Sequence, residues 1–182
     1  MKVGDVVDDF EAPDQHGTRR RLSELLAQGP LVLYFYPKAF TPGCTREACH
    51  FRDVAAEMRE AGGHAVGISA DAVDRQAAFD ARHSLGFPLL SDTDRSIARQ
   101  FGVKRLGPLF NKRSTFVIDT DRRLLAAFHS EIDMNSHADR AVEALLARPA
   151  REAELRGEAQ RRQAQAAAQN GQPITSEAGQ ER

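Results

Sequence analysis

The stretch Leu31–Asp53, LVLYFYPKAFTPGCTREACHFRD, decides the fold that we predict for this chain. Its first six residues form an apolar run between two prolines, which is typical of a central strand buried on both faces of a sheet. A turn follows, and then a helix is predicted over residues 41–61. Thr41 is expected to be its N-cap and Pro42 its first helical residue, and a Gly-Gly pair is expected to end it. The stretch therefore predicts a strand, a turn and a helix in succession.

The rest of the chain alternates short strands with helices. Strands are predicted at residues 18–22, 65–69, 87–90, 114–118 and 124–128, and helices at residues 23–27, 71–83, 92–101 and 137–147. The last two strands form an antiparallel hairpin, and Asp71 or Asp74 is expected to cap the helix that ends near His83. This order predicts an α/β protein with a thioredoxin-like fold, in which helices flank a mixed central sheet.

The domain organisation follows from a change in composition at Pro149. Residues 1–148 are long enough for one globular domain. Residues 149–182 contain one leucine, one isoleucine and no aromatic residue. Such a segment cannot bury enough apolar surface to offset its ordering entropy, so we predict a polar, disordered C-terminal tail. A solvated helix over residues 151–169 is the alternative.

Composition excludes several functions. The formal net charge of −1 supplies no field for gathering nucleic acid or anionic lipid. No apolar stretch approaches the ~18–20 residues of a membrane span, and the N-terminal residues lack the apolar segment of a secretory signal. We therefore expect a cytoplasmic protein without nucleic-acid or membrane partners. In that compartment the two cysteines are more often reactive or metal-bound than a permanent disulfide.

Cys44 has the position of a reactive thiol. With Thr41 as N-cap, it stands at the third helical position, in the first turn of the predicted helix. Unpaired backbone N–H groups and the positive end of the helix dipole favour a thiolate there, which is the nucleophilic form of cysteine. The Thr41 hydroxyl and these N–H groups could also hold a polar substrate against the sulfur. The alternative is that Cys44 is a small buried hydrophobic residue.

The spacing of Cys44 and Cys49 constrains what they can do together. Five residues along a helix correspond to roughly 7.5 Å of rise and about 140° of rotation. A disulfide needs Cα atoms within about 7 Å and converging Cβ atoms. The two cysteines therefore cannot bond while the helix is intact, and a bond between them requires its first turns to unwind.

Other interpretations of these polar residues remain open. Cys49 could simply pack against the side of the helix that carries Thr45 and Arg52. A zinc site is weaker, because Cys44, Cys49 and His50 lack a fourth ligand at ligand spacing. His137, at the start of the last predicted helix, is expected to be a surface or capping residue.

The spacing Pro37-x-x-x-Thr41-x-x-Cys44 resembles the active-site signature of the peroxiredoxins. The longer stretch YPKAFTPGCTREACHFRD resembles the bacterioferritin comigratory protein, or Q-type, subgroup of the alkyl hydroperoxide reductase/thiol-specific antioxidant family. The resemblance covers about residues 1–148. Further matches are Val3-Gly4-Asp5, Asp9-Phe10, Ile68-Ser69-Ala70-Asp71, Leu89-Leu90-Ser91-Asp92, Phe101-Gly102-Val103 and RSTFVID at 113–119.

The resemblance implies a thiol-dependent peroxidase on a thioredoxin fold. Cys44 would be the peroxidatic cysteine, which attacks a peroxide oxygen and becomes a sulfenic acid. Cys49 would be the resolving cysteine, which condenses with Cys44 to an intramolecular disulfide. Thioredoxin or a similar dithiol would then reduce the disulfide. No cofactor or metal is implied, and relatives in this subgroup are monomers or dimers.

The resemblance also implies roles for four neighbours of the thiol. Pro37 would shield the sulfur from water, and Thr41 would hydrogen-bond the thiolate and the peroxide. Arg113 would stabilise the thiolate and polarise the O–O bond, and Glu47 would help to orient the arginine. Ala39-Phe40 replaces a more polar pair, which makes the pocket mouth more apolar and favours organic hydroperoxides.

Two other functions compete with the peroxidase. A thiol-disulfide exchange protein of the same fold usually has a C-x-x-C motif, and none occurs in this sequence. A redox sensor would use disulfide formation to refold residues 41–52 and engage a partner. Turnover of peroxide with a reductant distinguishes the peroxidase from both.

Overall fold

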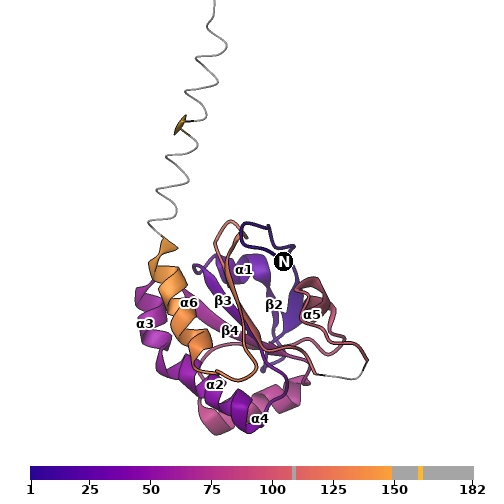
Figure 1. Ribbon diagram of the computed structural model, residues 1–182. Coiled ribbons are helices and arrows are strands. Elements are labelled where there is room, and N and C mark those ends of the chain that lie inside the picture. The colour runs from indigo at the N-terminus through magenta and orange to yellow at the C-terminus, as the bar shows by residue number, and fades with distance from the viewer. Residues whose placement is uncertain (108–109, 149–159, 162–182) are drawn as a thin grey trace, which may run out of the picture. The chain divides into compact units, whose positions relative to one another are not determined.

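A five-stranded mixed sheet lies at the centre of the unit Met1–Leu146, in the order β5-β4-β3-β6-β7 (Figure 1). The strands β3, β4 and β5 are parallel, whereas β6 is antiparallel to both β3 and β7. Every residue of β3 is buried, because this strand has a neighbour on each side and packed helices on each face. The strands are β3 (Leu31–Phe35), β4 (His64–Ser69), β5 (Leu89–Ser91), β6 (Ser114–Ile118) and β7 (Leu124–His129).

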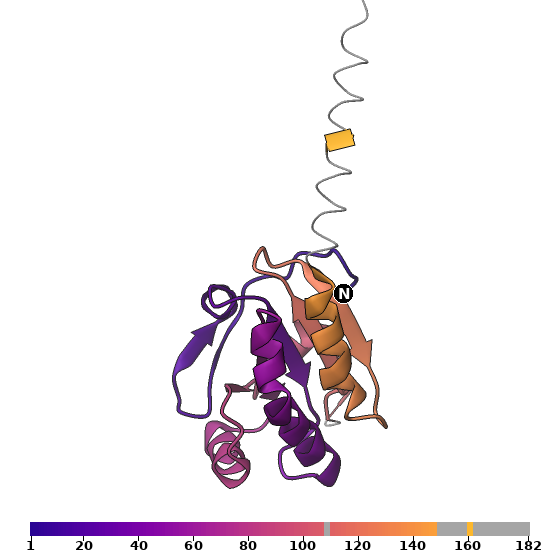
Figure 2. The same cartoon turned by 90° about the vertical axis from the view of Figure 1, so that its left-hand side faces the viewer.

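Helices cover both faces of this sheet. Leu31, Leu33 and Phe35 of β3 contribute to a core that includes α1 and α5. The alternate residues of β3 point to a second core that includes α2, α3, α4 and α6. Figure 2 shows α2 (purple) and α6 (orange) side by side, consistent with a 2.7 Å contact between His50 Nε2 and Asp139 Oδ1. The helices are α1 (Leu22–Leu26), α2 (Pro42–Asp53), α3 (Ala55–Glu60), α4 (Val73–His83), α5 (Ser96–Gln100) and α6 (Ser136–Leu146).

A second, two-stranded sheet precedes these elements, with β1 (Glu11–Pro13) antiparallel to β2 (Arg19–Arg21). The predicted α/β class and mixed sheet are therefore confirmed. The predicted helix over 41–61 is wrong in one respect, because it is divided into α2 and α3. Val54 stands at the division with φ and ψ of −94° and 5°, outside the helical region, and its β-branched side chain is a weaker helix former.

The predicted cap of α4 is also wrong. The N-cap of this helix is Ala72, with no side-chain hydrogen bond, so neither Asp71 nor Asp74 caps it. The carboxylate of Asp71 instead accepts hydrogen bonds from Ser69 and Ala39. The Asp71 side chain, which the sequence predicted as a helix cap, thus pairs with the buried backbone N–H of Ala39 in the turn after β3.

The computed structural model describes residues 1–107, 110–148 and 160–161. The chain divides into the units Met1–Leu146 and Ala147–Arg182. The tail predicted over residues 149–182 lies outside the described residues except at 160–161, so its disorder and the boundary at Pro149 stay predictions. Within the described parts of the chain, no helix has the length and apolar character needed to cross a membrane.

Candidate active site

The register of the central sheet brings four segments together at one edge, by which we mean the end of the sheet where the carboxyl end of β3 lies. Phe35, the last residue of β3, pairs with Ile68 near the end of β4 and with Ser114 at the start of β6. Ser114 also pairs with His129, the last residue of β7. The turn after β3, the residues after β4, Arg113 and the loop after β7 therefore meet at this edge, although they are far apart in the sequence.

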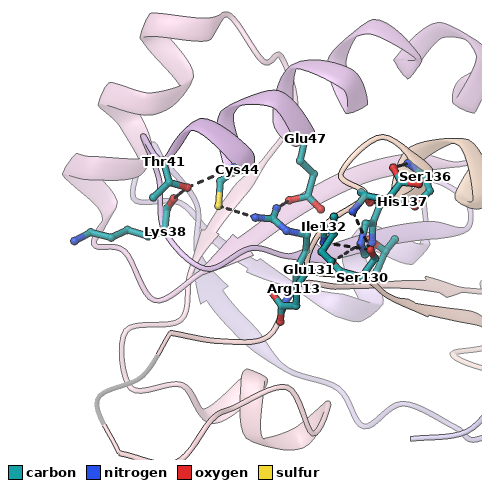
Figure 3. Close-up of polar contacts among 12 residues, drawn as sticks. Lys38, Thr41, Cys44, Glu47, Arg113, Ser130, Glu131, Ile132, Ser136 and His137 are labelled. Carbon is teal, nitrogen blue, oxygen red and sulfur yellow. Dashed lines mark hydrogen bonds and ion pairs between the residues drawn. The ribbon is translucent and has the colours of Figure 1, made fainter.

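Thr41 and Cys44 form the N-terminus of α2 at this edge. Thr41 is the N-cap, as predicted, and its Oγ1 accepts a hydrogen bond of 3.4 Å from the Cys44 backbone N–H. The same hydroxyl donates to the Lys38 carbonyl at 3.2 Å. Cys44 is 1% exposed, and its sulfur lies in the first turn of the helix (Figure 3). The positive end of the helix dipole favours negative charge at that position.

Arg113 lies directly against the sulfur. Its Nη2 donates to Cys44 Sγ at 3.3 Å, and its Nη1 forms an ion pair with the Glu47 carboxylate (Figure 3). The guanidinium thus bridges two side chains of α2 that are separated by one helical turn. Arg113 and Glu47 are 5% and 0% exposed, so water screens this pair very little. The structure therefore brings together Thr41, Cys44, Glu47 and Arg113.

Burial controls the protonation of the pair. Desolvation raises the pKa of Glu47 to about 8, and the neighbouring Arg113 guanidinium opposes this rise. Burial by itself lowers the pKa of Arg113, but Glu47 and Cys44 outweigh it and raise that pKa above its ordinary value. Arg113 therefore stays a cation beside the sulfur. Glu47 Oε1 has no hydrogen-bond partner among the described residues, in agreement with a carboxyl that is costly to ionise.

Cys49 and Pro37 are less closely tied to this cluster. Cys49 is half-buried on α2, and both cysteines are free thiols. Because α2 is continuous from Pro42 to Asp53, the two cysteines have the helical separation that prevents a disulfide. Pro37 is half-buried at the start of the turn after β3. Its shielding of the sulfur and the resolving role of Cys49 stay predictions.

The loop after β7 contributes residues that the sequence did not indicate. Glu131 Oε1 accepts from the Arg113 backbone N–H at 3.4 Å. Met134 lies against Gly43, because a Cβ placed at Gly43 would be only 2.7 Å from Met134 Cε. The same Cβ would lie 3.4 Å from Arg113 Nη2, so Met134 and the guanidinium line one small space. No local pattern identifies these residues, because the pairing of β6 with β7 brings the loop here.

His137 is fully buried, so the prediction of a surface or capping residue is wrong. Its Nε2 lies 3.0 Å from the Ser130 carbonyl oxygen (Figure 3). Its Nδ1 lies 2.9 Å from Thr115 Oγ1. A carbonyl only accepts, so Nε2 carries the hydrogen and, in the neutral ring, Nδ1 accepts from Thr115. Burial lowers the pKa of His137, which favours this neutral form. The four-residue step from His137 to buried Ala141 was the signal that could have indicated its burial.

Metal ligands are not assembled in the described residues, where no three His, Cys, Asp or Glu side chains form a group that could hold an ion. His50, the residue considered as a zinc ligand, is engaged with Asp139.

Comparison with known proteins defines the class as a thioredoxin-fold, thiol-dependent peroxidase. The chain belongs to the AhpC/TSA family, whose model matches residues 3–127. The crystal structure of peroxidoxin BcpB from Mycobacterium tuberculosis is 57% identical and has a TM-score of 0.78, with 81% of this chain and 97% of that chain covered. Peroxiredoxin Bcp of Escherichia coli is 38% identical over 143 residues, which cover 75% of this chain and 91% of that protein.

The resemblance to the bacterioferritin comigratory, or Q-type, peroxiredoxins is therefore confirmed. A further solved relative is the Xanthomonas campestris bacterioferritin comigratory protein, with 32% identity and a TM-score of 0.70. The comparison covers 76% of this chain and 91% of that one. These relatives also confirm the predicted thioredoxin-like fold.

Proposed function

We propose that this chain reduces hydrogen peroxide and organic hydroperoxides by a two-cysteine mechanism in which Cys44 is peroxidatic and Cys49 is resolving. The observation that carries the proposal is the 3.3 Å contact between Arg113 Nη2 and Cys44 Sγ at the N-terminus of α2. A buried cation and a helix N-terminus act on the same sulfur, and both stabilise a thiolate.

The first step is attack of the Cys44 thiolate on the distal oxygen of the peroxide. A sulfur–oxygen bond forms, the O–O bond breaks, and its electron pair leaves on the other oxygen, which takes up the proton that the Cys44 thiol released and departs as water or alcohol. The transferred oxygen keeps its own hydrogen, so Cys44 becomes a sulfenic acid. In this proposal the Thr41 hydroxyl oxygen accepts a hydrogen bond from the peroxide and orients it, and the Arg113 guanidinium stabilises charge on the breaking bond. Glu47 holds the guanidinium from its far side, while Pro37 limits the access of water.

The second step is attack of Cys49 on the sulfenic sulfur of Cys44. A sulfur–sulfur bond forms, and hydroxide leaves with the Cys49 proton as water. Because both cysteines lie on the continuous helix α2, this step requires the first turns of α2 to open. Thioredoxin or a similar dithiol then reduces the disulfide through a mixed disulfide and restores both thiols.

Two exposed aromatic side chains, one in the turn before Cys44 and one beside Lys38, support organic hydroperoxides as substrates. Phe40 is 39% exposed and Phe110 is 55% exposed, with Lys38 Nζ 5.4 Å from the centre of the Phe110 ring. Alkyl peroxide reduction activity is attributed to the related bacterioferritin comigratory protein of Xanthomonas campestris. The apolar side chains near Lys38 and this relative both support an alkyl peroxide as a second substrate.

Stopped-flow consumption of hydrogen peroxide and of an alkyl hydroperoxide, with thioredoxin as reductant, tests the proposal. Cys44→Ser should abolish turnover. Cys49→Ser should consume one peroxide per protein thiol and then recycle poorly. Wild-type rates in Cys44→Ser would end the proposal, and reduction of insulin without peroxide would favour a thiol-disulfide exchange protein instead. Very slow peroxide consumption without turnover would favour the redox sensor.

A further inference from the structure

The turn before Cys44 is fixed by hydrogen bonds that join its residue Ala39 to Asp71, which precedes α4, and to Arg75, which lies in α4. Ala39 is fully buried, so both of its backbone polar groups need partners inside the protein. Its N–H donates to Asp71 Oδ2 at 2.7 Å, and its carbonyl accepts from Arg75 Nη2 at 2.9 Å. Two oppositely charged side chains thus hold the two sides of one residue in the turn.

These two side chains are also tied to each other. Arg75 Nε lies 3.0 Å from Asp71 Oδ1, as an ion pair without hydrogen-bond geometry. The Ser69 hydroxyl donates to Asp71 Oδ2 at 2.8 Å. The Asp71 side chain is 7% exposed and the Arg75 side chain is 41% exposed, so the contacts of Asp71 are shielded from solvent while Arg75 stays partly screened by water. Ala39, Asp71 and Arg75 form a connected unit, which we call the Ala39 clamp.

Phe40, the next residue, is strained. Its φ of 68° lies in the left-handed region, which is rare for a bulky side chain. The Arg75 guanidinium lies 5.2 Å from the centre of the Phe40 ring, and the Phe79 ring packs edge-on at 5.2 Å between centroids. Such a conformation persists only where the surroundings over-determine it. Arg75 therefore holds both the backbone before Phe40 and the Phe40 ring.

We propose that Asp71 and Arg75 are positioning residues for the reaction of Cys44, an inference that rests on the proposed peroxidase function. Thr41 follows Phe40 directly and is the N-cap of α2, so the clamp determines how the Thr41 hydroxyl and the first turn of α2 are presented. Figure 1 shows α4 beside α2, from where Arg75 reaches the turn.

The clamp has opposite effects on the two chemical steps. It keeps the turn and α2 in the geometry that peroxide attack requires. The same contacts oppose the opening of α2 that Cys49 needs to reach Cys44. Weakening the clamp should therefore slow sulfenic acid formation and speed disulfide formation. A substitution on the same helix that leaves these contacts intact should not divide the two rates in this way.

Arg75→Ala is the test variant, and Arg82→Ala, at an exposed position on the same helix, is the matched control. Sulfenic acid formation is measured in a Cys49→Ser background, by quenching with a sulfenic-acid trap and mass spectrometry. The loss of one charge-assisted hydrogen bond corresponds to about a tenfold lower rate constant for Arg75→Ala. Arg82→Ala should keep the parental rate.

The second measurement uses chains with both cysteines and increasing peroxide. A second peroxide can oxidise the Cys44 sulfenic acid to sulfinic acid, releasing water or alcohol, and this reaction competes with disulfide formation. Arg75→Ala should shift the product toward disulfide and require about tenfold more peroxide for the same sulfinic fraction. Arg75→Lys keeps the charge but not the planar guanidinium. The peroxide concentration that it requires for the same sulfinic fraction should therefore lie between those of Arg75→Ala and the parent.

Unchanged sulfenic acid formation and an unchanged product ratio in the Arg75 variants would overturn the positioning role, and so would a parallel fall of both rates. If Arg75→Ala does not fold, Arg75→Lys gives the same two readouts. Failure of the Cys49→Ser parent to form any sulfenic acid would instead count against the proposed function. The two failures are thus distinguishable.

Discussion

Replacing Glu47 by glutamine tests the electrostatics of the buried pair at the thiol. Glu47 is 0% exposed and pairs with Arg113, which in turn contacts Cys44. The glutamine side chain has nearly the same shape, and its amide oxygen can still accept a hydrogen bond from Arg113. The substitution therefore removes a titratable group and leaves the packing almost unchanged.

The expected magnitude follows from the shift of one pKa. Burial raises the folded-state pKa of Glu47 from 4.5 to about 8. Between these values the folded state keeps a proton that the unfolded state has lost, so the free energy of unfolding falls as the pH rises, by about 1.4 kcal/mol per pH unit. Glutamine does not titrate, so the free energy of unfolding of Glu47→Gln lacks this decrease with pH. From about pH 5.5 to about pH 7.5, Glu47→Gln should gain stability relative to wild type, by roughly 2–3 kcal/mol.

The assay is urea unfolding of the reduced protein at several pH values in this range. Far-ultraviolet circular dichroism is the suitable signal, because the chain has no tryptophan. Titration of all other groups cancels in the difference between the two proteins. Glu60→Gln, at an exposed position, is the control for removing a carboxylate from the surface. A stability difference that stays constant with pH would contradict the raised pKa, because Glu47 would then titrate normally despite its burial.

Three further substitutions test local features of the structure. Thr41→Ala removes the N-cap acceptor of α2, so it should cost about 1 kcal/mol in urea unfolding and lower the peroxide rate, whereas Thr41→Ser should restore both. Gly43→Ala would place a Cβ 2.7 Å from Cε at the flexible end of Met134, which can move aside, so it should slow peroxide consumption only a few-fold, and adding Met134→Ala should recover the rate. An unrecovered rate would show that the contact with Met134 is not the cause. Gly29→Ala combines a φ of 128° with a Cβ only 2.5 Å from a backbone carbonyl oxygen. It should cost more than about 2 kcal/mol in urea unfolding, against about 1 kcal/mol for Gly17→Ala, where nothing lies within 4 Å; equal costs would contradict the clash.

Local sequence was sufficient wherever neighbours along the chain decide the outcome. The apolar run of β3 predicted a buried central strand, because a short continuous apolar run between two prolines is typical of a strand covered on both faces. Thr41 and Pro42 predicted the start of α2, because an N-cap and the first helical residue act on the next turn. The same local reasoning failed for His137 and for the capping role of Asp71, where partners from other segments decided the outcome.

The amino-acid sequence was enough to place Cys44 in the first turn of a helix, five residues before Cys49, because helical geometry repeats over short distances. The resemblance to the peroxiredoxins added Arg113 as a candidate, but not its place. The meeting of Arg113 with Cys44 at 3.3 Å, and the two charged side chains that hold Ala39, emerged from the tertiary structure alone. The physical reason is that these contacts depend on strand register. Antiparallel pairing of β6 with β3 and parallel pairing of β4 with β3 bring distant residues to one edge of the sheet, which no local pattern records.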